Sequence, residues 1–397
     1  MRPAVLAAPS LLAALSLALS VSSRPARADE AAPAPTDDGP AAATPHDGPA
    51  DSSSTPPRPG AGIPAVARRN DWFMLPVVFY LPETRLGFGA TAGLHLAMND
   101  APRPASVFAA VVYTLEKQGT LDLAGDLTLP SGTYLSARSR ALYYPDQYFG
   151  LGPRTPSSAR EDFTRESVEL VTTAEQPVPR AHGLRAGLRL DLRAEAIRDR
   201  QPGGALAADA VSGASGSSAV AGGPSFTWDT RDNTFWTRSG TLAQLWYVVA
   251  PTGLGHHARF GRGVLEVRHF FSLPAGRALG VDAYAEEADG TPPFTLLPKL
   301  GSTRFMRGIR EGRYRDRVEW ALQTELRTPV WRRISATAFA AIGDVAPRWS
   351  AFTLASPKVT GGAGLRYRLT DEGANLRVDV AAGRFGLQLY VLVLEAF

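Results

Sequence analysis

Apolar and polar residues alternate along much of the chain from residue 70 onwards. Residues 120–129 read TLDLAGDLTL, residues 184–193 read LRAGLRLDLR, and residues 375–380 read NLRVDV. Successive side chains of a β-strand point to opposite faces, so this alternation predicts strands with one apolar and one polar face. About 16 such segments follow one another, at residues 74–81, 86–97, 105–115, 119–129, 132–143, 163–174, 183–197, 218–229, 239–249, 258–272, 277–287, 317–329, 333–344, 358–369, 374–383 and 386–397.

The length of these segments favours a membrane protein. Several exceed the roughly 9–11 residues that a tilted strand needs to cross a bilayer, and no window after residue 28 has the roughly 18 apolar residues of a transmembrane helix. In hydrocarbon every backbone amide must be paired, so strands can span a membrane only as a closed barrel. We therefore predict an all-β fold, a transmembrane antiparallel β-barrel of about 16 strands. A water-soluble β-sandwich or barrel is the alternative.

Aromatic residues and connection lengths are consistent with such a barrel. Aromatic pairs at segment ends, such as Trp72–Phe73 and Trp246–Tyr247, suit a girdle at the membrane interface. Some connections look short, as at Pro82–Arg85 and Pro274–Arg277, and others look long, as at Pro145–Asp162 and Ala288–Arg317. We expect the short ones to be periplasmic turns and the long ones to be outer loops.

The N-terminal residues have a different character. Residues 1–28 combine Arg2, an apolar run and the sequence Ala26-Arg27-Ala28, which predicts a cleaved secretory signal peptide. Residues 29–69 are almost entirely Ala, Pro, Asp, Ser, Thr and Gly and predict a disordered periplasmic tail. Residues 70–397 form the predicted barrel. Together these features predict the outer membrane of a Gram-negative bacterium as the location.

Composition excludes several functions. The chain has no cysteine, so it has no disulfide or thiolate metal site. Removal of the predicted signal peptide, which carries three arginines and no acid, would lower the formal net charge from +4 to +1, so no nucleic-acid partner is expected. The histidines lack ligand spacing, and no nucleophile elbow, zinc-protease motif or phosphate loop is present. We predict no catalytic residues, no bound metal, no cofactor and no enzymatic activity.

One charged segment stands out. Residues 304–317 read RFMRGIREGRYRDR, with six arginines between two predicted strands. A solvated surface loop could carry these charges without further function. On a membrane barrel the loop must either lie in water or fold into a polar lumen and pair there.

Several motifs together resemble the BamA/TamA superfamily of outer-membrane barrels, also called the bacterial surface antigen family. The resemblance covers roughly residues 72–397. It rests on residues 228–240 (WDTRDNTFWTRSG), 306–309 (MRGI) with 315–316 (RD), 325–329 (ELRTP), 343–345 (GDV) and 390–397 (YVLVLEAF). Two features depart from the family pattern: Ile309 stands where an aromatic residue is usual, and the polypeptide-transport-associated domains that typically precede the barrel are missing.

The resemblance implies a role for particular residues. The long loop between the eleventh and twelfth strands would fold into the lumen, where Arg307 would pair with Glu325 and Asp344 and Gly308 would allow a tight turn. Its other arginines would face water or lipopolysaccharide. Asp229, Arg231, Asp232 and Gly240 would build a turn, since Asp and Asn bond their own backbone. The last strand, from Tyr390 to Phe397, would be the signal that the barrel-assembly machinery reads.

The resemblance also implies the function. Such a barrel would aid insertion or transport of proteins or lipids at the outer membrane, through a weak seam between its first and last strands. Its partners would be outer-membrane lipid, lipopolysaccharide, the barrel-assembly machinery and an unidentified periplasmic protein. A passive channel or structural barrel without insertase activity is the alternative.

Overall fold

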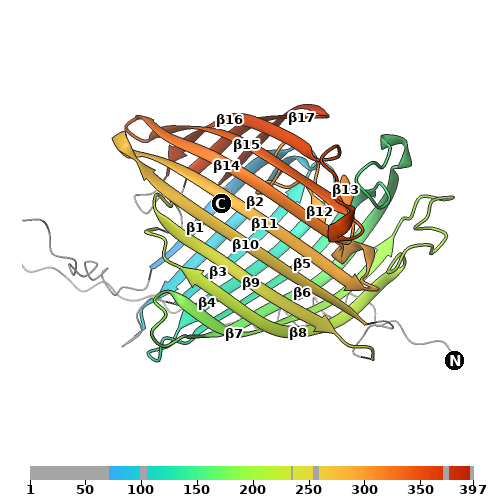
Figure 1. Cartoon of the computed structure of the whole chain (residues 1–397), viewed down its shortest axis with the longest axis horizontal. Coiled ribbons are helices and arrows are strands. Elements are labelled where there is room, and N and C mark those ends of the chain that lie inside the picture. Colours follow the sequence, from blue (N-terminus) through green and yellow to red (C-terminus); the bar gives the residue numbers. More distant parts are fainter. Residues whose placement is uncertain (1–70, 99–104, 234–235, 254–258, 370–374, 394–397) are drawn as a thin grey trace, which may run out of the picture. The chain divides into compact units, whose positions relative to one another are not determined.

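The computed structural model describes residues 71–98, 105–233, 236–253, 259–369 and 375–393. The predicted signal peptide (1–28), the predicted tail (29–69) and Phe397 lie outside these ranges. Within the described residues, sixteen antiparallel strands form one closed barrel in which each strand pairs with its neighbours in sequence (Figure 1). The prediction of an all-β barrel of about 16 strands is confirmed.

The barrel strands are β1 (Asp71–Leu81), β2 (Arg85–Leu96), β3 (Ala105–Thr114), β4 (Gly119–Thr128), β5 (Tyr134–Tyr148), β6 (Glu161–Pro177), β7 (Leu184–Arg198), β8 (Gly216–Asp229), β9 (Gly240–Ala250), β10 (Phe260–Leu273), β11 (Arg277–Gly290), β14 (Val318–Trp331), β15 (Ile334–Ala346), β16 (Lys358–Arg368), β17 (Asn375–Gly383) and β18 (Gly386–Val393). Between β11 and β14, the short strands β12 (Lys299–Leu300) and β13 (Tyr314–Arg315) pair with each other. Single 3₁₀ turns lie at Ser157–Ala159, Pro274–Gly276, Phe294–Leu296 and Trp349–Ala351.

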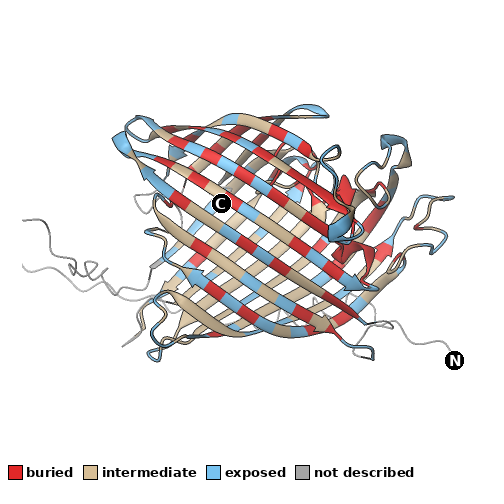
Figure 2. Cartoon of the chain, in the orientation of Figure 1, coloured by how far each residue is buried: buried red, intermediate tan, exposed pale blue. Residues whose placement is uncertain are grey.

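Each strand separates its side chains into two faces, as the sequence pattern requires. On β14, Leu322 and Leu326 are exposed, whereas Gln323, Glu325 and Arg327 are buried. Figure 2 shows the resulting bands of buried and exposed residues along the strands. The sheet therefore has one face of exposed apolar residues and one face, here called the polar face, on which charged side chains are buried.

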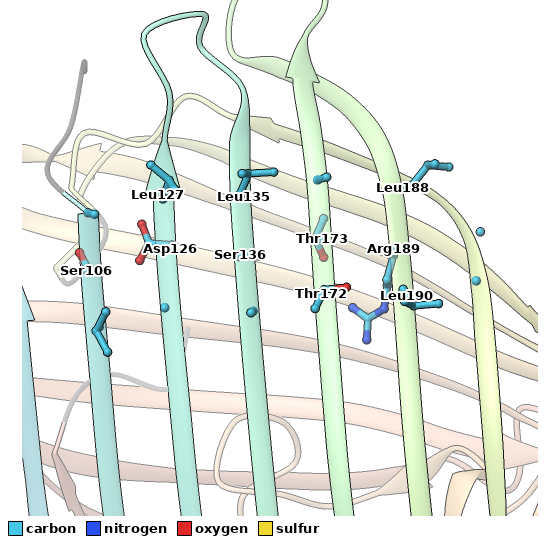
Figure 3. Close-up of a pocket in the computed structure, with 17 residues that line it drawn as sticks. Ser106, Asp126, Leu127, Leu135, Ser136, Thr172, Thr173, Leu188, Arg189 and Leu190 are labelled. Carbon is cyan, nitrogen blue, oxygen red and sulfur yellow. The ribbon is translucent and has the colours of Figure 1, made fainter. Parts of the chain in front are cut away.

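The polar face continues from strand to strand because the register aligns it. Ser106 pairs with Asp126, Asp126 with Ser136, Ser136 with Thr173, and Thr173 with Arg189, so one polar row crosses β3 to β7. These residues line a hollow of about 730 Å³ that also includes small residues of β8 (Figure 3).

The connections only partly follow the predicted asymmetry. Consecutive strands run in opposite directions, so the connections fall alternately at the two ends of the barrel. The long loops 149–160, 199–215, 291–317 and 347–357 all lie at one end. The predicted short turn at Pro82–Arg85 is also at this end, which corrects the expectation that short connections are all periplasmic. The end of a connection is fixed by strand direction and not by loop length.

Two boundaries also differ from the prediction. The loop expected from Pro145 begins only after Tyr148, because β5 and β6 stay in register from Tyr134 opposite Glu175 to Tyr148 opposite Glu161. Pro145 itself lies within β5, opposite Thr164.

The barrel closes between β1 and β18. Among the described residues, Tyr80 and Val391 are the register pair that joins these strands, whereas β1 and β2 pair continuously from Asp71–His95 to Leu81–Arg85. Pro76 of β1 has no amide hydrogen and cannot donate to a ladder. Among the described residues, this closure has the fewest register pairs of any two neighbouring strands, and residues 394–397 after β18 lie outside the described ranges.

Within the described residues, no helix has both the length and the apolar character needed to cross a membrane.

Candidate functional site

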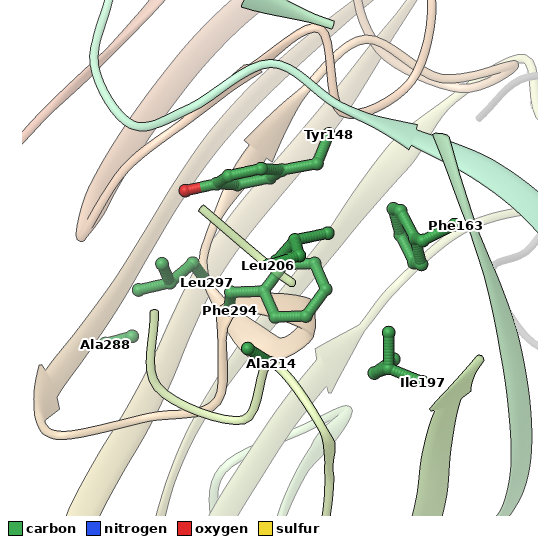
Figure 4. Close-up of a cluster of buried hydrophobic side chains, with 8 residues drawn as sticks. All are labelled: Tyr148, Phe163, Ile197, Leu206, Ala214, Ala288, Phe294 and Leu297. Atoms are coloured by element: carbon green, nitrogen blue, oxygen red, sulfur yellow. The ribbon is translucent and has the colours of Figure 1, made fainter. Parts of the chain in front are cut away.

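The arginine-rich segment belongs to the loop 291–317, which joins β11 to β14. The first part of this loop is held by an apolar cluster at the rim of the barrel. The ring of Phe294 lies edge-on to Tyr148 and Phe163, with centroid distances of 5.3 and 5.4 Å (Figure 4). The Phe294 amide donates to the carbonyl oxygen of Ser212 at 2.8 Å. The loops 199–215 and 291–317 therefore pack together over β5, β6 and β7.

The second part of the loop forms its own apolar core. Met306, Ile309 and Tyr314 are buried with Leu300 and Phe305 against β14 and β15. Ile309, which departs from the aromatic residue usual in the family, is 2% exposed. An aliphatic side chain is thus accommodated at this position.

Arg307 extends from this core to the polar face of the barrel and is fully buried. Its Nη2 lies 2.7 Å from Oε2 of Glu325 on β14, and its Nη1 lies 2.5 Å from Oδ2 of Asp379 on β17. The guanidinium carbon is 3.5 Å from the ring centroid of Phe339 on β15. One planar fork therefore joins the loop to three strands through two charge-assisted hydrogen bonds and one cation–π contact.

The two carboxylates have further cationic partners. Arg327 donates to Glu325 at 3.0 Å, and Arg366 donates to Asp379 at 2.5 Å. Arg377 lies 3.6 Å from Asp379. Four guanidinium groups therefore surround two carboxylates, and positive charge exceeds negative charge at this buried site.

Gly308 brings the loop backbone against the wall of the barrel. Its φ of 103° falls in the left-handed region that favours glycine, and an added Cβ would lie 3.1 Å from the carbonyl carbon of Ala382. The Gly308 amide donates to the Tyr390 hydroxyl at 2.8 Å, and that hydroxyl donates to Gln388 at 2.6 Å. Tyr390, expected only as part of a C-terminal signal, thus contacts the loop directly.

The structure brings Arg307 and Glu325 together but does not place Asp344 with them. Asp344 accepts hydrogen bonds from Lys358 and from Ser356, the latter at 2.5 Å. In register, Phe339 pairs with Glu325, whereas Asp344 pairs with Trp320. Asp344 is five residues beyond Phe339, so strand alternation directs it away from the face that Arg307 contacts. The predicted Arg307–Asp344 pair is wrong, and Asp379 takes that position.

Asp379 could have been found from the sequence. It alternates with Leu376, Val378 and Val380, and this pattern puts it on the polar face of its strand. The pattern does not show that β17 lies within reach of a loop 72 residues earlier.

The predicted turn motif forms the connection between β8 and β9. Arg231 donates twice to Asp229, at 3.0 Å each, and Asp232 accepts from the amides of Arg238 and Ser239. Gly240 has a φ of 100°, and a Cβ there would clash with the carbonyl of Thr230. These contacts build a turn.

Arg327 connects this turn to the Arg307 site. It donates to Glu325 and also to the carbonyl oxygen of Thr237 at 3.2 Å. Its guanidinium carbon lies 5.0 Å from the ring centroid of Trp236. Two motifs that are separate in the sequence therefore share one side chain.

The remaining arginines of the loop do not all face solvent. Arg313 and Arg315 are 5% and 3% exposed, which corrects the expectation that they face water or lipopolysaccharide. Arg315 donates to the carbonyl of Phe294 at 2.9 Å, and Arg313 donates to the hydroxyl of Thr155 at 2.8 Å. Burial lowers the pKa of both side chains from the usual value. Arg313 thus links the loop to the loop 149–160 at the rim of the barrel, whereas Arg315 joins two parts of the loop 291–317.

Solved structures that are similar to this chain include BamA and CdiB. BamA from Haemophilus ducreyi lacking POTRA domains 1–3 is similar with a TM-score of 0.57 and 11% identity, over 82% of this chain and 70% of that one. CdiB from Acinetobacter baumannii is similar with a TM-score of 0.51 and 11% identity, over 81% of this chain and 59% of that one. The chain has their barrel fold. No protein-family model and no curated protein matches the sequence. At the level of the fold, the resemblance inferred from the motifs is confirmed.

Proposed function

We propose that this chain is an outer-membrane barrel of the BamA/TamA superfamily that aids insertion or transport of proteins or lipids at the outer membrane. The observation that carries the proposal is the sparse junction between β1 and β18, where Tyr80–Val391 is the described register pair. The barrel fold shared with BamA and CdiB supports it. The proposed activity is not enzymatic.

The proposal assigns the two faces of the sheet. The exposed apolar face contacts outer-membrane lipid, and the polar face surrounds the lumen. The loop 291–317 then folds into the lumen, with Arg307 as its anchor to β14 and β17. The signal peptide, the periplasmic tail, the barrel-assembly machinery, lipopolysaccharide and a periplasmic partner belong to the same proposal.

The mechanism follows from backbone hydrogen bonding. A sparsely paired edge leaves amide and carbonyl groups that a further strand can satisfy. Opening β1 from β18 presents such an edge to a client segment. The Arg307 site meanwhile keeps β14, β16 and β17 together through Glu325, Arg366 and Asp379, so opening is confined to the seam.

A disulfide across the seam tests this mechanism. The chain has no native cysteine, so Tyr80→Cys with Val391→Cys introduces a single possible disulfide. Thr324→Cys with Ala340→Cys is the matched control, because these residues pair on the exposed face of β14 and β15. We expect the seam disulfide to abolish the cellular phenotype, reduction to restore it, and the control to have no effect. A locked seam with an intact phenotype refutes the insertase proposal.

A passive channel is the second candidate, favoured by the continuous polar row on β3 to β7. In planar bilayers, a channel plugged by the loop would conduct weakly, and Arg307→Ala would increase its conductance. A seam disulfide would leave this conductance unchanged. If neither the unmodified protein nor Arg307→Ala shows conductance steps, the channel proposal is wrong.

A further inference from the structure

A cleft of about 480 Å³ opens between the loops 149–160 and 347–357, at the end of the barrel that carries the long loops. One wall consists of Leu151, Arg154 and Thr155, and the other includes Thr353 and Ser356. These loops follow β5 and β15, which lie far apart around the barrel, so the cleft is a feature of loop packing and not of one hairpin.

Basic side chains from four segments lie in or near this cleft: Arg154 lines it, and Arg313 donates to Thr155 in its wall. Arg154 comes from the loop 149–160, Arg313 from the loop 291–317, Lys358 from the start of β16, and Arg384 from the connection between β17 and β18. Arg154 and Arg384 are both close enough to Lys358 to interact with its charge, and Arg384 also interacts with Arg313. Like charges gathered in this way repel one another unless an anion lies among them.

The carboxylates nearby do not neutralise this set. Asp344 pairs with Lys358 and also accepts from Ser356. Asp316 lies near Gly152 and accepts from the Arg317 amide, so its carboxylate offsets part of this charge without an ion pair to Arg154, Arg313 or Arg384 in the described structure. Among the described residues, Arg154, Arg313 and Arg384 form no ion pair with a carboxylate. Within the described part of the chain, these three guanidinium groups therefore have no carboxylate partner.

One of these arginines is held in place before any ligand binds. Arg313 is 5% exposed, donates to both the hydroxyl and the carbonyl of Thr155, and lies 4.7 Å from the ring centroid of Phe149. Its Nε is buried without a hydrogen-bond partner in the described structure. Arg154 and Arg384 are exposed and free to close on a ligand. A fixed cation next to mobile ones suits capture of an oxyanion.

We propose that this cleft is a binding site for a phosphate group, with Arg154 and Arg384 as its donors and Arg313 as a fixed positive charge beside them. Guanidinium groups bind phosphate through paired, charge-assisted hydrogen bonds, and the hydroxyls of Thr353 and Ser356 supply further polar contacts. Exposed Leu151 and Leu354 lie in the two loops that form the cleft. The phosphate can be borne by a lipid of the outer leaflet or be free in solution.

Calorimetric titration of the intact protein in detergent micelles tests the site with two probes. The first probe is inorganic phosphate, compared with chloride at equal ionic strength. The second is purified lipopolysaccharide, compared with its dephosphorylated form. Tighter binding of lipopolysaccharide than of inorganic phosphate identifies a lipid-borne phosphate, and equal binding identifies the free anion.

Variants of single arginines distinguish binding at this cleft from non-specific attraction to positive charge on the protein. Arg154→Ala and Arg384→Ala should each weaken binding about tenfold, as expected for a charged hydrogen bond, and Arg154→Lys should retain part of the affinity. Arg160→Ala is the control, because Arg160 is an exposed arginine of the same loop that pairs with Asp162 at 3.2 Å. Retained heat-modifiability shows that each variant is folded. The proposal is overturned if neither probe binds, if inorganic phosphate binds no more tightly than chloride and dephosphorylation of lipopolysaccharide has no effect, or if Arg160→Ala weakens binding as much as Arg154→Ala.

Discussion

Replacing Arg307 with alanine should release the loop 291–317 from the barrel wall. The substitution removes a fully buried guanidinium that contacts Glu325 at 2.7 Å and Asp379 at 2.5 Å. Removing one partner of a buried ion pair costs about 3–5 kcal/mol, because a charge is left without compensation. Here Arg327 and Arg366 remain next to the two carboxylates. We therefore expect the lower end of that range, about 3 kcal/mol, which corresponds to a change of about 100-fold in the unfolding equilibrium.

Urea unfolding in micelles and limited trypsin digestion together measure this effect. The loop retains arginines at 304, 310, 313, 315 and 317 in the variant, so trypsin can still cleave it once it is released. Arg304→Ala is the matched control: its side chain is 43% exposed, and its partner Glu266 also binds Arg268. Because Arg304 is partly exposed and Glu266 keeps Arg268 as a partner, we expect this pair to contribute at most about 1 kcal/mol. If Arg307→Ala and Arg304→Ala unfold at the same urea concentration and resist trypsin equally, Arg307 does not anchor the loop.

Four further changes test other parts of the structure. Gly308→Ala should destabilise the barrel by about 2 kcal/mol in urea unfolding, since alanine disfavours the φ of 103°; an unchanged midpoint would contradict the tight turn. Phe339→Leu removes the cation–π contact with Arg307, and this loss should reduce stability by about 1–2 kcal/mol in addition to the cost of changed packing. The additional loss should be absent when Phe339→Leu is made in the Arg307→Ala variant. Asp344→Asn should destabilise the rim near Lys358 by about 2 kcal/mol while the loop stays resistant to trypsin; loop cleavage would restore Asp344 as a partner of Arg307. Burial raises the pKa of Glu83, in the connection between β1 and β2, from 4.5 to about 7, so its contribution to stability is fully present below pH 4.5 and is lost as pH rises through about 7. The melting temperature of Glu83→Gln should therefore not show this fall with rising pH. Parallel curves of melting temperature against pH for Glu83→Gln and the unmodified protein would refute the prediction.

The sequence predicted the strands well because membrane barrels impose a strict alternation. A strand with one apolar and one polar face must repeat every two residues, and this signal is local. The correct partner of Arg307 depended on the same rule. On β15, alternation places Asp344 on the opposite face from Phe339, which contacts Arg307. On β17, alternation places Asp379 on the opposite face from Val378, which is the polar face. Which strands the loop reaches depends on how the barrel closes, and no local pattern contains that information.

Other contacts could not be predicted for a related reason. Arg327 joins Glu325 to the carbonyl of Thr237, 90 residues earlier in the chain. Arg313 reaches Thr155 across 158 residues. Long arginine side chains have many reachable partners, and the choice among them is made by the packing of loops that lie together only in the folded barrel. The burial of Arg313 and Arg315 was missed for this reason.

The contacts of the Arg307 site should also form in a definite order while the barrel folds. Glu325 is 18 residues from Arg307, so that pair can form as soon as β14 is in place. Asp379 and Tyr390 lie 72 and 82 residues away from the loop residues they bind, and they become available only when β17 and β18 have been added. Closing such long segments is entropically costly and slow, so these two bonds should be among the last to form. A protease-resistant loop would then report that the last strand has been incorporated, and an incomplete barrel would be marked for degradation by its exposed arginines.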